Sequence, residues 1–222
     1  MAARARVLAN PSPEVLRQWM AEPQSLGFER QPVARQAAAL YAATLGQRQL
    51  RDFAAARASL SRLEAVVRDD LPALRQTRLL GAELALAASQ PDAVLQQLPA
   101  LAPYAMSRPE LLLRTEALLA LGRPVQAHEA LQSWLASHPR DATVWQTLSR
   151  VWAAQGKTLR SVRAEAEAHA VRYDYGAAVD RLKAGQDLAR RSTAPEDHIE
   201  ATIIDINIDR LRFANGEMDF AD

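Results

Sequence analysis

The stretch Ala142–Gly156, ATVWQTLSRVWAAQG, contains the pattern on which most of the chain is built. Its large apolar residues recur every three or four positions, as on one face of an α-helix: Val144, Trp145, Leu148, Val151 and Trp152. Gly156 follows them, and helices commonly end beside a glycine in the left-handed conformation. The stretch therefore predicts a helix over residues 142–155 that buries one face.

The same features recur on both sides of this helix. Ala, Leu, Arg, Gln and Glu dominate the sequence and favour helices, and prolines stand near the expected helix starts. We predict helices over residues 12–22, 33–47, 51–68, 72–89, 91–98, 109–121, 124–137, 142–155, 158–173, 175–191 and 195–213. Their short connections place successive helices antiparallel and adjacent. The predicted fold class is all-α.

The segment 199–213 carries two competing patterns. Residues 204–209 alternate between apolar and polar, which is typical of a strand. Helical spacing also fits, along a stripe of Ile199, Ile203, Ile206 and Phe213 that Ile204, Ile208 and Leu211 widen. Because a lone strand would leave its backbone groups without partners, we predict a helix whose Ile-rich face covers the preceding helix pair.

An internal repeat is visible at an offset of about 34 residues. Gly122 then matches Gly156, and Leu118 matches Trp152. One set of residues resembles the first helix of a tetratricopeptide repeat: Trp145, Leu148, Ser149, Trp152 and Gly156. The second helix of such a repeat has a small residue followed four positions later by a leucine. Three pairs of residues resemble it: Ala56 and Leu60, Ala127 and Leu131, and Ala178 and Leu182.

These patterns predict tetratricopeptide-like antiparallel helix pairs, stacked into a short right-handed solenoid with a C-terminal capping helix. We divide the chain into four parts. They are an N-terminal segment with a short helix (1–30), degenerate repeats (31–195), a capping helix (196–214) and a disordered tail (215–222). Helices 158–173 and 175–191 could pair either way. An irregular helical bundle is the alternative.

Composition excludes several classes of function. A formal net charge of +1 argues against nonspecific nucleic-acid binding. No stretch reaches the roughly 18 apolar residues that a membrane span requires. The absence of cysteine excludes disulfides and thiolate metal sites.

No catalytic, cofactor-binding or metal-binding residue is predicted in this chain. His128–Gln132 begins like the zinc motif HExxH, but Gln132 replaces the second histidine. Two carboxylate pairs, Asp205 with Asp209 and Glu165 with Glu167, stand near arginines and predict ion pairs on solvated helix faces. The tryptophans at helical spacing predict core packing.

Five stretches suggest a family. They are Met1–Leu8, Ala37–Ala43, Arg163–Ala168, Asp180–Gln186 and Ile199–Asp205. They resemble the tetratricopeptide C-terminal domain of bacterial periplasmic zinc metallopeptidases, the family of the beta-barrel assembly-enhancing protease. The resemblance implies a non-catalytic domain that holds a substrate, or an outer-membrane assembly partner, near a protease. It implies a periplasmic location and an upstream domain that binds zinc through HExxH, of which residues 1–30 would be the tail.

The repeat pattern also predicts where a polypeptide partner binds. First helices of such repeats line a concave groove, and counting from Trp145 assigns to it Tyr41, Leu112, Glu116, Thr143, Gln146, Arg150 and Ala154. Three alternatives stay open. They are an enzyme with a carboxylate pair or a metal assembled across helices, a stand-alone scaffold, and an oligomerisation module that uses helix 195–213.

Overall fold

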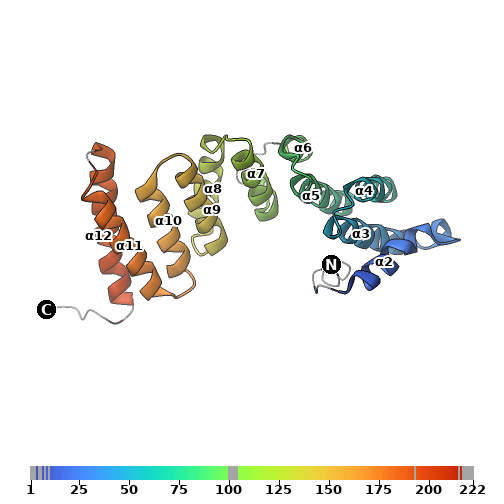
Figure 1. The fold of residues 1–222 in the computed structure, drawn as a ribbon, viewed down its shortest axis with the longest axis horizontal. Helices are drawn as coiled ribbons and strands as arrows, with labels where there is room; N and C mark the ends of the chain where they lie inside the picture. Colours follow the sequence, from blue (N-terminus) through green and yellow to red (C-terminus); the bar gives the residue numbers. More distant parts are fainter. Residues whose placement is uncertain are drawn as a thin grey trace. The chain divides into compact units, whose positions relative to one another are not determined.

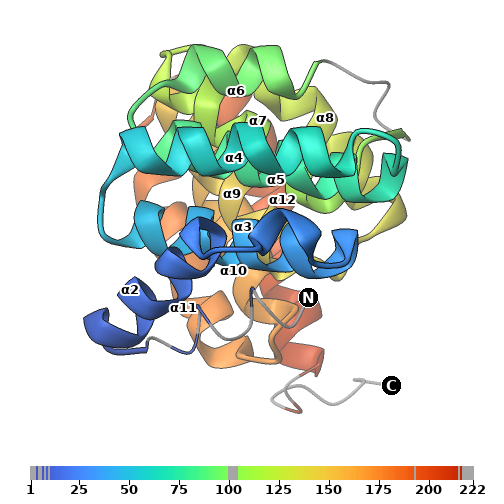
Figure 2. The same ribbon diagram turned by 90° about the vertical axis from the view of Figure 1, so that its right-hand side faces the viewer.

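The computed structural model describes residues 4, 7, 9, 11–99, 105–192, 194–214 and 216. The chain forms two compact units, Met1–Ala100 and Leu101–Asp222, which we describe separately. In each, consecutive α-helices pack on one another (Figure 1; Figure 2). No strand occurs in the described residues. The predicted all-α class is therefore confirmed, and the division between the units falls inside the segment 31–195 predicted to hold the repeats.

Unit 1 is built around α3, which packs against α2 on one side and α4 on the other. Leu16, Leu40, Leu63 and Leu80 from four successive α-helices are buried in its core, together with Phe28. The segment 1–30 thus contributes to this core. The elements are α2 (Pro13–Ala21), the 3₁₀ helices η1 (Glu22–Gln24) and η2 (Phe28–Arg30), α3 (Val33–Gln49), α4 (Phe53–Val67), α5 (Leu71–Ala87) and α6 (Pro91–Gln97).

Unit 2 contains α7 (Arg108–Ala120), α8 (Val125–Ser137), α9 (Ala142–Ala154), α10 (Thr158–Ala170), α11 (Tyr175–Ala189) and α12 (Pro195–Ala214). Helix α7 packs on α9 as well as on α8. Helix α10 packs on α9, α11 and α12, so the two pairings left open by the sequence both occur. Each predicted helix is present in the described residues, with ends within three residues of the prediction. Of the predicted disordered tail 215–222, all but Gly216 lies outside the described residues.

Among the described residues, five helices end in the same left-handed turn. The residue after the turn donates its N–H to the carbonyl five positions earlier, as from Lys157 to Trp152 at 2.9 Å, which satisfies one of the orphan carbonyls of the helix end. In these five turns the residue with positive φ is Arg51 (61°), Ser89 (57°), Gly122 (66°), Gly156 (74°) or Tyr173 (64°). The predicted helix ends at Gly122 and Gly156 are therefore confirmed.

The small-residue positions of the repeat pattern lie in the core. Ala56, Ala127 and Ala178 are fully or almost fully buried, and so are the leucines four residues after them. A small side chain at these positions lets neighbouring helices approach closely.

Helix α11 approaches both α10 and α12 closely at Gly185. A Cβ atom on this residue would lie 3.0 Å from Cγ1 of Val162 and 3.1 Å from Cδ1 of Ile204. Glycine is therefore the residue that lets α11 sit between α10 and α12.

Helix α12 buries only one part of the predicted Ile-rich face. The core side consists of Glu200, Ile204, Ile208 and Leu211, whereas Ile199, Ile206 and Phe213 are exposed. Glu200 accounts for the rotation, because its buried carboxylate pairs with Arg160 at 2.9 Å and with Arg163 at 3.1 Å. A buried carboxylate requires such partners, so the face with Glu200 turns toward α10.

This stripe can be tested by a pair of substitutions two residues apart. We expect Ile204→Ala to destabilise unit 2 by about 3 kcal/mol, because it leaves a cavity in the core. Ile206→Ala removes a side chain that is 62% exposed and changes stability by less than about 0.5 kcal/mol. Urea unfolding of both variants measures the difference, and equal losses would contradict the assigned stripe.

Candidate functional site

The residues predicted on α9 lie together on one exposed side of this helix. Thr143, Gln146, Arg150 and Ala154 are all exposed. Positions three or four residues apart share a helix face, and the packing of α7 on α9 places Glu116 beside Arg150. We call the surface formed by these five residues and Leu112, which is half-buried on α7, the α7/α9 face.

Polar contacts link the side chains of the α7/α9 face. The guanidinium of Arg150 donates two hydrogen bonds to the carboxylate of Glu116, one of them 2.9 Å long. These bonds raise the pKa of Arg150 above its ordinary value, although burial opposes them. The Oε1 atom of Gln146 accepts a hydrogen bond of 3.1 Å from Arg172, which follows α10. The face is thus a network of paired polar groups at the surface.

Tyr41 belongs to unit 1, so it is described apart from the other predicted residues. It is half-buried on α3, and its hydroxyl accepts a hydrogen bond from Arg4 at 3.2 Å. Arg4 also pairs with Glu83 of α5 at 2.7 Å, and Glu83 pairs with Arg48 at 3.2 Å. Tyr41 therefore belongs to a polar cluster within unit 1.

Asp141 fixes the start of α9 and hence the position of the α7/α9 face. Its carboxylate accepts hydrogen bonds from the Val144 N–H at 3.2 Å, from Trp134 Nε1 at 3.1 Å, and from Arg108 at 2.6 and 3.0 Å. Burial alone would raise the pKa of Asp141, but these hydrogen bonds outweigh it and lower the pKa below its ordinary value. The folded unit therefore favours the ionised carboxylate.

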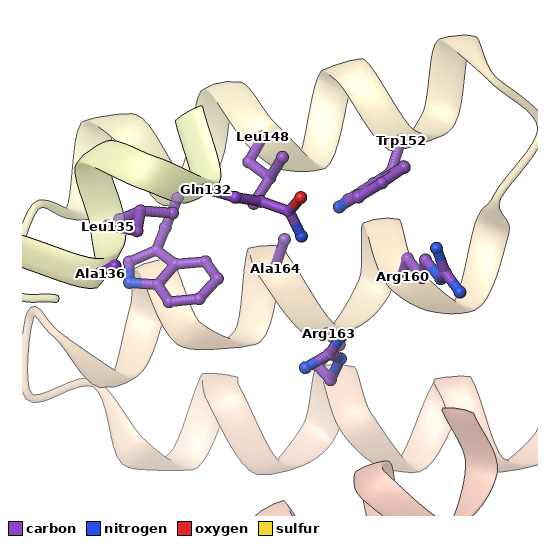
Figure 3. Close-up of a pocket in the computed structure, with 9 residues that line it drawn as sticks. Gln132, Leu135, Ala136, Leu148, Trp152, Arg160, Arg163 and Ala164 are labelled. Carbon is purple, nitrogen blue, oxygen red and sulfur yellow. The ribbon is translucent and has the colours of Figure 1, made fainter. Parts of the chain in front are cut away.

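A pocket of about 280 Å³ lies on the other side of α9, between α8 and α10. Figure 3 shows Gln132 of α8 and Trp152 of α9 extending toward each other over Ala164 of α10. Successive residues of an α-helix are about 100° apart, so Leu148 and Trp152 point away from Arg150. The pocket and the α7/α9 face are consequently two separate surfaces.

A wider groove of about 570 Å³ continues from this pocket between α9, α10 and α12. The two share Trp145 and Arg163 in their linings. Tyr173, Tyr175 and Arg210 are also among the residues that line the groove. We call the pocket and the groove together the Trp145 groove.

The sequence analysis missed the Trp145 groove because its aromatic residues lie on the predicted core stripe. The prediction of core packing is confirmed for Trp152, which is buried, with the ring of His128 stacked at 4.9 Å and the guanidinium of Arg160 at 5.3 Å. Trp145 is only half-buried and lines the groove instead. A signal was present in the two tryptophans seven residues apart, since large aromatic residues are enriched in interface centres.

The other sequence candidates for chemistry lie in ion pairs and stacks. Glu165 pairs with Arg181, Glu167 pairs with Arg210 at 2.5 Å, and Asp205 accepts from Gln186 at 2.6 Å. His128, the first residue of the incomplete HExxH motif, packs on Trp152. Within the described residues, no cluster of three or more His, Asp or Glu side chains could hold a metal ion. None of the described helices is long and apolar enough to cross a membrane.

Comparison with known proteins gives no matching family model and no match among curated proteins.

The role of Asp141 predicts a pH-dependent variant. Asp141→Asn keeps the cap on α9 but loses the charged pair with Arg108, so we expect a loss of about 1 kcal/mol in unfolding free energy at neutral pH. Folding lowers the pKa of Asp141, so its ionised carboxylate stabilises the folded unit. This stabilisation is complete above the ordinary pKa of 3.8 and disappears as the pH falls through the pKa that Asp141 has in the folded unit.

Urea unfolding of the wild type and the variant, at about pH 7 and about pH 3, measures this change. The control is Asp52→Asn, at the residue whose side chain caps α4 through the N–H of Ala55. Asparagine is an equally good cap, so we expect little change there. A deficit in Asp141→Asn of the same size at both pH values would show that the charge of Asp141 contributes nothing.

Proposed function

We propose that this chain is a non-catalytic helical-repeat domain that binds a protein partner. The observation that carries the proposal is the packing of α7 on α9 across α8, with Glu116 and Arg150 paired 34 residues apart. That separation is the tetratricopeptide period. The recurring left-handed helix ends support the same interpretation. In a repeat of this kind, successive first helices form a binding surface for another polypeptide.

The chemistry of the α7/α9 face suits an extended polypeptide. Its exposed side chains are short or polar, and Thr143 and Gln146 can donate and accept hydrogen bonds. Arg150 offers a guanidinium whose charge Glu116 already balances, so neither sign of partner charge is strongly favoured. Side chains of this kind can bind backbone carbonyl and N–H groups with little preference for one sequence.

We further propose that the domain handles substrates or assembly partners for a periplasmic zinc metallopeptidase concerned with outer-membrane proteins. The support is the resemblance of the five sequence stretches to that family. In this proposal zinc belongs to an upstream peptidase domain, and this chain supplies no catalytic residue. An immunoblot of fractionated native cells tests it. A periplasmic band of about twice this mass agrees with the proposal, and a cytoplasmic band of 24.4 kDa would contradict it.

Binding of an unfolded polypeptide tests the α7/α9 face. The probe is fluorescent, reduced and carbamidomethylated lysozyme, a basic chain that arginines do not attract. We expect Gln146→Ala with Arg150→Ala to weaken binding about fivefold, roughly 1 kcal/mol. The melting temperature should stay within about 1 °C, since exposed residues contribute little to stability.

The matched control for this test is Gln126→Ala with Arg190→Ala, which removes one exposed glutamine and one exposed arginine elsewhere in unit 2. It should bind the probe like the wild type. Equal binding by both double variants and the wild type would reject the α7/α9 face as the binding surface.

A second candidate function is self-association through α12. The exposed Ile199 and Ile206 favour it, because isoleucine on one side of a helix is suited to packing against a copy. If α12 is an interface, light scattering should show a dimer that becomes a monomer in the Ile199→Asp, Ile206→Asp variant. A wild-type monomer at all concentrations would exclude this function.

A further inference from the structure

The Trp145 groove presents arginines to the surface and keeps carboxylates beneath them. Glu200 has a side chain only 7% exposed, whereas Arg160 and Arg163, which pair with it, are 35% and 31% exposed. In the wider part of the groove, Glu167 is 17% exposed and its partner Arg210 is 53% exposed. A molecule entering the groove therefore meets guanidinium groups before it meets carboxylates.

The charges of the groove do not cancel. Arg160 and Arg163 share the single carboxylate of Glu200, which leaves one positive charge. Arg140 also lines the wider part of the groove, and it forms no ion pair with another described residue. A guanidinium whose N–H donors are not all used can bind a further carboxylate through two parallel hydrogen bonds.

Aromatic residues line the groove together with these arginines. The indole Nε1 of Trp145 donates a hydrogen bond of 2.9 Å to the carbonyl of Pro139, which holds the ring in place. Trp145 is half-buried and lines both parts of the groove. Tyr173 also lines the groove and is exposed, on a backbone with φ of 64° that disfavours bulky residues. Tyr175 packs edge-on against it, with ring centroids 6.2 Å apart.

We propose that the Trp145 groove binds an acidic peptide segment that contains an aromatic residue. The aromatic side chain packs on Trp145, and flanking carboxylates pair with Arg140, Arg163 and Arg210. Charge complementarity selects the acidic partner, and the apolar floor formed by Leu148, Ala164 and Ala170 selects one with a large apolar side chain. This site is on the opposite side of α9 from the α7/α9 face and does not depend on it.

Three fluorescein-labelled synthetic peptides test the proposal with the full chain. The first is Gly-Asp-Glu-Phe-Asp-Glu-Gly, the second replaces each acidic residue by lysine, and the third replaces phenylalanine by alanine. Fluorescence anisotropy should show binding of the first peptide, weakened at least about tenfold in either of the others. Binding should also weaken when salt rises from about 50 to about 300 mM, because the exposed ion pairs are screened.

Two charge reversals on opposite sides of unit 2 supply the matched comparison. Arg140 lies in the exposed connection before α9, so the Arg140→Glu variant should fold normally. It should bind the first peptide at least about tenfold more weakly than the wild type. Arg150→Glu, on the α7/α9 face, should leave binding within about twofold. Trp145→Leu should weaken the first peptide and abolish its advantage over the alanine peptide. Unchanged binding in Arg140→Glu, or equal losses in the two reversals, would overturn the proposal.

Other occupants are separate outcomes of the same titration. If single-stranded oligothymidine or vesicles of phosphatidylglycerol displace the acidic peptide at equal or lower concentration, the groove is a general anion surface and the peptide proposal is wrong.

The variant with Gln146→Ala and Arg150→Ala separates this site from the proposed function. It should bind the unfolded lysozyme probe about fivefold more weakly and bind the acidic peptide like the wild type, so that either proposal can fail without the other.

Discussion

The carboxylate of Asp141 joins three helices of unit 2. It accepts hydrogen bonds from Arg108 at the start of α7, from Trp134 near the end of α8, and from the backbone of Val144 at the start of α9. One ionised acceptor thus sets where α9 begins relative to the two helices before it. Both proposed binding surfaces depend on that placement, because Trp145 and Gln146 follow Val144 directly and point to different sides of α9.

The helices could be predicted from the sequence because their signals are local. Apolar spacing, prolines at helix starts and Gly122 or Gly156 at helix ends act within a few residues of one another. The buried stripe of α12 could not be predicted this way. It is determined by Glu200, whose partners Arg160 and Arg163 are about forty residues earlier in the chain. The division after residue 100 was missed for a similar reason, since helical signals continue on both sides of it.

The candidate surfaces show the same distinction between local and distant information. Gln146 and Arg150 lie on one exposed stripe of α9, and such a shared stripe can be predicted because it follows from helix geometry alone. Predicting the Trp145 groove requires the packing of the helices from α8 to α12 at once. Trp145 and Trp152 share an apolar stripe in the sequence, and only the separation of α8 from α10 leaves one of them half-exposed while the other is buried.

The close approach at Gly185 limits how the end of unit 2 can be divided. Helix α11 also contains Gly176, and each glycine makes an isolated helix less stable by about 1 kcal/mol relative to alanine. Helix α11 therefore relies on α10 and α12 for its formation. Repeat arrays are often shortened or extended one helix pair at a time, but a cut between α10 and α11, or between α11 and α12, removes packing that α11 requires. The last three helices would have to be transplanted into another protein as a single block.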